Sequence, residues 1–226
     1  MVNILLVHGA IADGSSWSRV IPILQDAGHH VVAAQQPLSS IPDDVARVRQ
    51  ALDNLEGPTV VVGHSFGGCV ITNAAHGASN VKSLVYVAAF APDEGETVTA
   101  LGEPFGQPPA AKYFVTDPQG RVTLPQDMFV EYFAFDVDPV QARIMAAVQG
   151  PSDAARFGFI SGPPAWREFP SWYVVAGNDL IIGTQLEEVL ADRMGAKTTK
   201  VAGASHAVMV SNPDAVAQVI LEAAAG

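Results

Sequence analysis

The stretch that decides the fold is residues 59–67, TVVVGHSFG. Its first four residues form an apolar run typical of a buried strand, and a G-x-S-x-G pentapeptide follows where a helical pattern begins. A serine at so sharp a strand-to-helix turn is held in a strained backbone conformation with its hydroxyl exposed. Gly63 and Gly67 leave room for the bend, because a Cβ at either flank would collide with a neighbouring strand or helix. We therefore expect Ser65 to be a nucleophile.

The chain contains six apolar runs of this kind, with helical patterns between them. The runs are continuous rather than alternating, which indicates strands that are buried on both faces. Strands that alternate with helices over this length predict a parallel sheet with helices on both sides. The predicted strands are 2–7, 30–35, 58–63, 82–89, 171–176 and 197–202, and the predicted helices lie near 16–27, 41–55, 65–77, 184–194 and 213–225.

Residues 92–168 interrupt this rhythm. They hold ten of the sixteen prolines and ten of the seventeen aromatic residues. An insertion of this length is too long for an ordinary connection between strands. Two short helical patterns near 126–134 and 139–149 predict a small, mostly helical cap inserted between the fourth and fifth strands. We expect one domain over 1–226, with a core of 1–91 and 169–226 and a cap of 92–168.

The composition excludes several classes of protein. The chain has 226 residues, of which 49% are hydrophobic and 15% are charged, and this balance argues against disorder. The net charge of -11 makes nucleic acid and anionic membrane unsuitable partners. One cysteine, Cys69, allows no internal disulfide, and no targeting segment or membrane-spanning run is visible. We expect a soluble, cytoplasmic protein that is a monomer or a homodimer.

A serine hydroxyl needs a base to take its proton, and the base needs a third group that orients it. In an open parallel sheet such groups follow the carboxyl ends of the strands. His206 is the best candidate for the base, because it comes after the last strand and before the final helix. The other five histidines fit less well. We expect His29 and His30 at the wrong end of the sheet and His76 at the far end of a helix. His64 should point away from Ser65, and His8 suits a structural role in its loop.

Asp179 is the best candidate for the orienting acid. It directly follows the fifth strand, and the chain order Ser, Asp, His is the usual one for this kind of triad. Asp93, which follows the fourth strand, is the alternative acid. Asp179 could instead be a turn or capping residue, since aspartate is common after a Gly-Asn pair.

An oxyanion hole needs two backbone N–H groups that converge on the substrate carbonyl oxygen. The first is expected from Phe66, directly after the serine. The second is expected from Ala10, in the loop after the first strand, where Gly9 allows a close approach. Cys69 lies one helical turn after Ser65, and we interpret it as a small buried packing residue. No cluster of His, Cys or carboxylate residues has metal-ligand spacing, so we expect neither a metal nor a cofactor.

Nearly the whole chain resembles the α/β-hydrolase superfamily. The residues that carry the resemblance are His8-Gly9-Ala10, the 63–68 turn, Asp179 and His206. The chain looks closest to a compact esterase branch that includes plant methyl-ester hydrolases and hydroxynitrile lyases. The resemblance implies the α/β-hydrolase fold, a triad of Ser65, His206 and Asp179, and an oxyanion hole formed by Ala10 and Phe66.

Two positions depart from the hydroxynitrile lyases of that branch. Those enzymes have a lysine directly after the catalytic histidine, where this chain has Ala207, and a threonine in the first-strand loop, where it has Gly9. The sequence therefore favours a serine carboxylesterase that hydrolyses small to medium apolar or aromatic esters through an acyl-enzyme. Two alternatives remain: the same triad used for lactone or C–C bond hydrolysis, perhydrolysis or lyase chemistry, and a ligand-binding, receptor-like protein with a vestigial triad.

Overall fold

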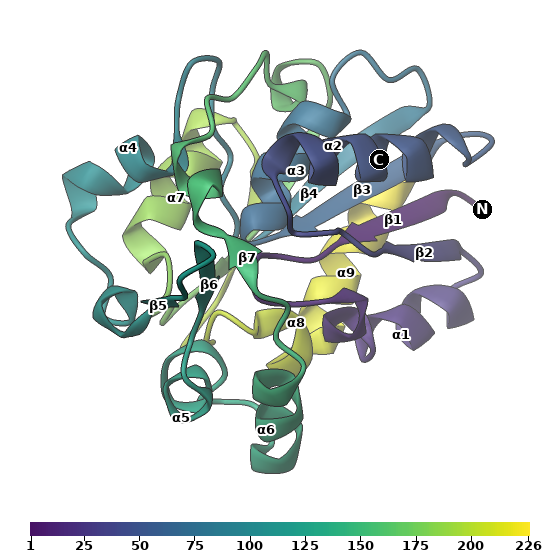
Figure 1. Ribbon diagram of the computed structural model, residues 1–226. Helices are drawn as coiled ribbons and strands as arrows, with labels where there is room; N and C mark the ends of the chain where they lie inside the picture. Colours follow the sequence, from purple (N-terminus) through teal and green to yellow (C-terminus); the bar gives the residue numbers. More distant parts are fainter.

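A computed structural model describes all of residues 1–226, and its centre is a six-stranded parallel sheet (Figure 1). The strand order is β2-β1-β3-β4-β8-β9. Every neighbouring pair in this sheet is parallel. The six predicted strands and their parallel arrangement are thus confirmed. The strands are β1 (Asn3–Val7), β2 (His30–Ala34), β3 (Thr59–His64), β4 (Val81–Val87), β8 (Ser171–Ala176) and β9 (Lys197–Val201).

Helices cover both faces of the sheet (Figure 1). One face carries α2 (Ile41–Asp53), α3 (Phe66–Ala74) and α7 (Thr184–Arg193), and the other carries α1 (Val20–Asp26), α8 (Val208–Ser211) and α9 (Pro213–Ala225). A 3-10 helix, η1 (Gly14–Trp17), precedes α1. None of the helices combines the length and the apolar composition that crossing a bilayer requires.

Alternate residues of the central strands feed two separate hydrophobic clusters. On β3, Val60 and Val62 pack toward α9, whereas Val61 packs toward α3. All three side chains are fully buried. This is the burial pattern that a continuous apolar run predicts, because a parallel strand covered by helices has no solvent-facing side.

The segment 92–168 leaves the sheet after β4 and returns at β8. Its two predicted helical stretches are α5 (Gln126–Met128), which continues into a π-helical turn η4 (Phe129–Phe133), and α6 (Pro139–Ala147). It also contains a small antiparallel sheet that the sequence analysis does not anticipate: β5 (Val115–Thr116), β6 (Arg121–Thr123) and β7 (Ser152–Asp153). The remaining elements are α4 (Val98–Gly102) and the 3-10 helices η2 (Glu103–Phe105), η3 (Ala111–Tyr113), η5 (Ala154–Gly158) and η6 (Ala165–Arg167).

A buried ion pair ties this segment to the core. Arg156 on η5 is 2% exposed, and its Nη2 lies 3.3 Å from Oδ2 of Asp44 on α2. The guanidinium also donates to the Leu38 carbonyl and lies 5.3 Å from the ring centroid of Phe66. Burial raises the pKa of Asp44, and the charge of Arg156 only partly offsets that effect. Each charge therefore depends on its partner.

Replacing Arg156 with methionine is expected to lower the free energy of unfolding by about 3–5 kcal/mol at pH 7, because it leaves Asp44 buried and uncompensated. The measurement is urea unfolding followed by circular dichroism. The double variant Arg156→Met with Asp44→Asn removes both charges and should regain more than half of the loss. Equal losses in the single and the double variant would contradict this account of the pair.

Candidate active site

The register of the sheet brings the candidate residues to one edge. Val7 pairs with Gly63, and His64 pairs with Val87, which in turn pairs with Val174. Strands β1, β3, β4 and β8 therefore end close together. The loops that carry the predicted functional residues all start at this edge, as expected for an open parallel sheet.

Ser65 lies between β3 and α3 in a conformation that L-residues rarely adopt, with φ 54° and ψ -124°. Its N–H donates to the carbonyls of Val87 and Ala88 at 3.2 and 3.1 Å. Its own carbonyl accepts from the N–H of Phe90 at 3.1 Å. The end of β4 thus holds the strained turn in place, in agreement with the strain predicted from the pentapeptide.

The glycines around Ser65 sit where a side chain would not fit. A Cβ on Gly63 would lie 2.6 Å from the Gly67 carbonyl oxygen, and one on Gly67 would lie 2.6 Å from the His8 carbonyl oxygen. A Cβ on Gly9 would lie 2.7 Å from Cβ of Ser65. The loop after β1 therefore lies directly against the serine.

The two backbone N–H groups predicted for an oxyanion hole flank this contact. Phe66 opens α3, and Ala10 belongs to the loop that touches Ser65. Neither N–H donates to another group of the protein. The Ala10 loop is fixed on its far side by Ser152 of β7, whose Oγ accepts from the N–H of Ile11 at 3.2 Å. Both N–H groups are available to a ligand, and the positive end of the α3 dipole lies beside them.

His206 and Asp179 form a buried pair. His206 Nδ1 lies 2.5 Å from Oδ2 of Asp179, and both side chains are fully buried. Oδ1 of Asp179 accepts from the N–H groups of Ile181 and Ile182 at 2.7 and 2.9 Å. Burial alone would raise the pKa of Asp179, but the His206 charge and these hydrogen bonds outweigh it and hold the pKa below its ordinary range. An ionised Asp179 fixes the proton of His206 on Nδ1.

The other ring nitrogen of His206, Nε2, is buried and has no hydrogen-bond partner. No hydrogen bond joins it to Ser65 in this structure. The free Nε2 retains the lone pair that a general base uses. Hydrogen bonds of this kind are often long in a protein without substrate and shorten when the substrate binds.

Asp93, the alternative acid, lies elsewhere. Its carboxylate forms an ion pair with Arg167 and caps the N–H of Glu94. It makes no hydrogen bond to His206. The structure thus pairs the histidine with Asp179 and not with Asp93.

His64 contacts His206 in a way that the sequence analysis misses. Its Nε2 lies 2.9 Å from the His206 backbone carbonyl, and the two ring centroids are 4.7 Å apart. A carbonyl only accepts, so Nε2 of His64 carries the proton. Burial, together with the nearby charge of His206, lowers the pKa of His64 well below its usual value. A neutral His64 therefore holds the backbone of His206 in place through this hydrogen bond.

His8 and Cys69 have surroundings that suit a structural role. His8 is buried: its Nδ1 donates a hydrogen bond to the Gly9 carbonyl, and its Nε2 accepts one from the Gln36 N–H. This is the loop-bonding role expected for it. Burial raises the pKa of the Cys69 thiol to about 12, so this cysteine is an inert packing residue at neutral pH. No group of three or more His, Cys, Asp or Glu side chains is placed to hold a metal ion.

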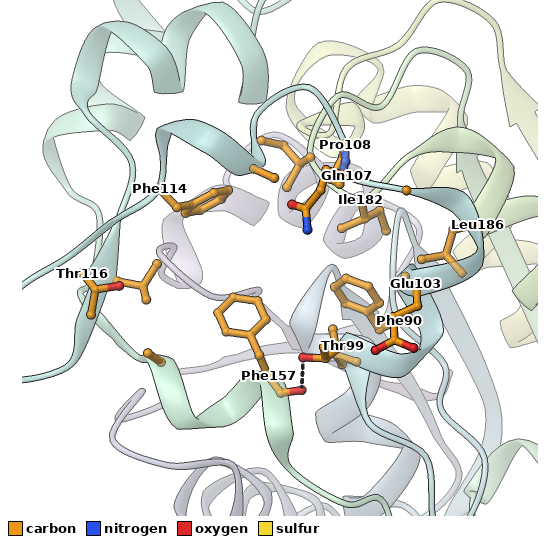
Figure 2. Close-up of a pocket in the computed structure, with 17 residues that line it drawn as sticks. Phe90, Thr99, Glu103, Gln107, Pro108, Phe114, Thr116, Phe157, Ile182 and Leu186 are labelled. Carbon is orange, nitrogen blue, oxygen red and sulfur yellow. Dashed lines mark hydrogen bonds between the residues drawn. The ribbon is translucent and has the colours of Figure 1, made fainter.

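Ser65 lines a small cavity that lies next to a larger one. The smaller, about 70 Å³, is lined by Ser65 and Phe66 together with apolar residues. The larger, about 530 Å³, lies mostly within the 92–168 segment, and Figure 2 shows three aromatic rings and Ile182 around it. Both cavities share the residues Phe90, Phe114, Phe157, Ile181 and Ile182. A largely apolar chamber thus adjoins the space at the serine.

The fold and the strained strand-to-helix turn at Ser65 define the class of protein. Residues 4–219 match the profile of the Alpha/beta hydrolase family, and the chain belongs to this family. The crystal structure of polyneuridine aldehyde esterase has the same fold, with a TM-score of 0.87 at 18% sequence identity over 99% of each chain. The predicted fold class is confirmed.

Among individual proteins, the chain is similar to a pyrethroid hydrolase of Sphingobium wenxiniae, with 26% identity over 98% of this chain and 87% of the relative. It is 30% identical to methylesterase 2 of Arabidopsis thaliana over 46% of this chain and 45% of the relative. An alpha-hydroxynitrile lyase of the same plant is 30% identical over 40% and 41%. These matches confirm the resemblance to the methyl-esterase and hydroxynitrile lyase branch.

Proposed function

We propose that this protein is a serine carboxylesterase that hydrolyses small to medium apolar or aromatic esters through an acyl-enzyme. Ser65 is the nucleophile, His206 the general base and acid, and Asp179 the residue that orients His206. The N–H groups of Ala10 and Phe66 form the oxyanion hole. The proposed cap, 92–168, supplies most of the substrate chamber.

The observation that carries the proposal is the state of His206. Its Nδ1 is bound to a buried, ionised Asp179, while its Nε2 has no hydrogen-bond partner. Its ring lies 4.7 Å from the ring of Phe133, which lines the small cavity together with Ser65. This is the arrangement in which a histidine accepts a serine proton. A neighbouring strained serine with two available N–H groups supports acyl transfer in particular.

The proposed reaction has two steps. Ser65 Oγ attacks the ester carbonyl carbon while Nε2 of His206 takes the hydroxyl proton, and the bond to the alcohol oxygen then breaks as that proton passes to the leaving alcohol. Water next gives a proton to Nε2 of His206 and attacks the acyl carbon. The bond between that carbon and Ser65 Oγ then breaks, the proton passes from Nε2 to Oγ, and the acid is released. Each oxyanion donor is expected to contribute about 3 kcal/mol to the barrier reduction.

The chamber supports an apolar substrate. Its lining is rich in aliphatic and aromatic side chains, and its volume of about 530 Å³ suits a group of drug-like size. The relatives named as a pyrethroid hydrolase and a methylesterase point the same way. Ala207 is fully buried and uncharged at the position where the lyase reading needs a cation, which favours hydrolysis.

The test is hydrolysis of nitrophenyl esters of increasing acyl length, combined with labelling by a fluorophosphonate. We expect saturable hydrolysis of the short and medium esters and a stoichiometric adduct on Ser65. An adduct on Ser65 without hydrolysis of any ester would contradict the esterase proposal and favour other chemistry by the same triad, tested next on lactones. Absence of both would favour a receptor-like protein.

The size of the large chamber gives a second expectation. Ala111 lines this chamber but not the small cavity at Ser65. Replacing Ala111 with tryptophan should lower kcat/KM for the longest accepted ester about tenfold or more and leave the acetate nearly unchanged, because steric exclusion from an apolar pocket has this magnitude. Equal effects on both esters would mean that the chamber does not receive the acyl chain. Val140→Trp, on the exposed face of α6, is the matched control.

A further inference from the structure

Helix α7 holds the turn that carries Asp179. The Thr184 hydroxyl accepts from the Asp179 N–H at 3.1 Å and donates to the Ala176 carbonyl at 2.7 Å. One turn further along the helix, Oε2 of Glu187 accepts from the Ala176 N–H at 2.8 Å. Both ends of the turn 176–179 therefore depend on side chains of α7.

Glu187 is an unusual residue for this position. Its side chain is fully buried, and it takes part in none of the protein's ion pairs. Its second oxygen, Oε1, receives no hydrogen bond from any donor. A buried carboxylate in this state would carry a large desolvation cost. A proton on Oε1 would remove the charge and turn the unpartnered oxygen into a donor.

The groups that face Glu187 decide where that proton goes. The charges that act on Glu187 are those of Asp179, on the turn after β8, and of Glu188, the next residue on α7, and the Tyr173 phenol on β8 is coupled to it as well. His206 binds Asp179 through Oδ2. Burial and the Asp179 charge raise the pKa of Glu187 well above its usual value. The pKa of Asp179 is held low, so of the two carboxyl groups Glu187 keeps the proton at neutral pH.

Asp179 has an acceptor site to spare. Its Oδ1 receives two backbone N–H groups and its Oδ2 receives His206, whereas a carboxylate offers about four lone-pair sites. We propose that Glu187 is a positioning residue whose protonated carboxyl donates a hydrogen bond to Asp179 and holds that carboxylate ionised and aimed at His206. This inference rests on the proposed function, since it concerns how the orienting acid is itself oriented.

Two variants test the role in catalysis. Glu187→Gln keeps a neutral donor and an acceptor for the Ala176 N–H, and we expect its kcat/KM on a nitrophenyl ester to stay within about threefold of the parent. Glu187→Leu has neither group, and we expect a loss of about 10- to 100-fold that falls on kcat and leaves KM nearly unchanged, because Glu187 touches no substrate. Equal activity of the two variants would overturn the proposal.

A stability measurement separates this inference from the proposed function, because it needs no substrate. The pKa of Glu187 is higher in the folded protein than the ~4.3 of an unfolded chain. Its contribution to stability is therefore complete below ~4.3 and is lost as pH rises toward the folded pKa. Glu187→Gln does not titrate.

The melting temperature of Glu187→Gln relative to the parent protein should thus increase steadily from pH 5 to pH 9. A difference that does not change with pH would show that Glu187 is ionised in the folded protein, and this would overturn the inference whether or not the protein hydrolyses esters. A rising difference in a protein that hydrolyses no ester would show that Glu187 is protonated in the folded protein, as the inference requires, and would reject the esterase function alone.

Discussion

Replacing Ser65 with alanine is expected to reduce kcat for ester hydrolysis about 10⁴- to 10⁶-fold, down to the rate that oxyanion stabilisation and binding support without a nucleophile. The physical reason is that no other group at the site can attack the carbonyl. The substitution removes one oxygen atom. Alanine is an L-residue of similar size at the same strained backbone position, so the fold should persist. The measurement is steady-state hydrolysis of nitrophenyl butyrate.

Cys69→Ala is the matched control, because Cys69 lies one helical turn further along α3 and is the other side chain near Ser65 of a type that can act as a nucleophile. Its thiol is buried and protonated, so we expect hydrolysis within about twofold of the parent protein. Retention of most of the activity in Ser65→Ala, or its loss in Cys69→Ala, would contradict the assignment of the nucleophile.

Replacing Asp179 with asparagine is expected to lower kcat about 10⁴-fold, the size of the effect when the orienting acid of such a triad becomes an amide. Asparagine presents an N–H to His206 or leaves its Nδ1–H without a charged partner, so the ring is no longer fixed with Nε2 as the acceptor. Circular dichroism and thermal unfolding should accompany the kinetics, because Asp179 also accepts from the N–H groups of Ile181 and Ile182.

Asp93→Asn is the paired variant, and we expect it to stay within about twofold of the parent protein. Asp93 pairs with Arg167, whose side chain is largely exposed, and exposed ion pairs contribute little. A larger loss in Asp93→Asn than in Asp179→Asn would transfer the role of the acid to the strand β4 loop.

Most of the sheet could be predicted from the sequence because its strands are buried on both faces. Such strands appear as continuous apolar runs, and all six predicted runs coincide with observed strands to within two residues. The fourth run extends through Ala89, but β4 ends at Val87 because Ala88 adopts φ 43° where the backbone turns to hold Ser65. The apolar run continues through this turn, so the sequence pattern does not predict it.

The 92–168 segment could be predicted only in outline. Strands of two or three residues, such as β5 and β7, are too short to show a period, and 3-10 turns have no clear sequence signature. The π-helical turn at Phe129–Phe133 occurs inside a stretch that reads as an ordinary helix. The Phe133 ring of that turn lies 4.7 Å from the His206 ring, so the irregular turn packs against the candidate site.

The residues of the candidate site could be predicted from the sequence where they follow shortly after the end of a strand. His206, Asp179 and Ala10 all occupy such positions. His64 and Glu187 do not, because their roles depend on which carbonyl or carboxylate lies across a packed interface. The one available signal for Glu187 is its place in α7. The apolar helix positions around it predict that its side chain is buried, and they offer no partner for its charge.

The central claim is that ester hydrolysis passes through an acyl group bound to Ser65. Rapid mixing with nitrophenyl acetate, acid quenching within milliseconds and mass spectrometry of the digested protein test it most directly. We expect a transient acetyl group on the peptide that contains Ser65, formed with a burst of nitrophenol and absent from Ser65→Ala. Turnover without any acetylated peptide, or with the acetyl group on another residue, would contradict it.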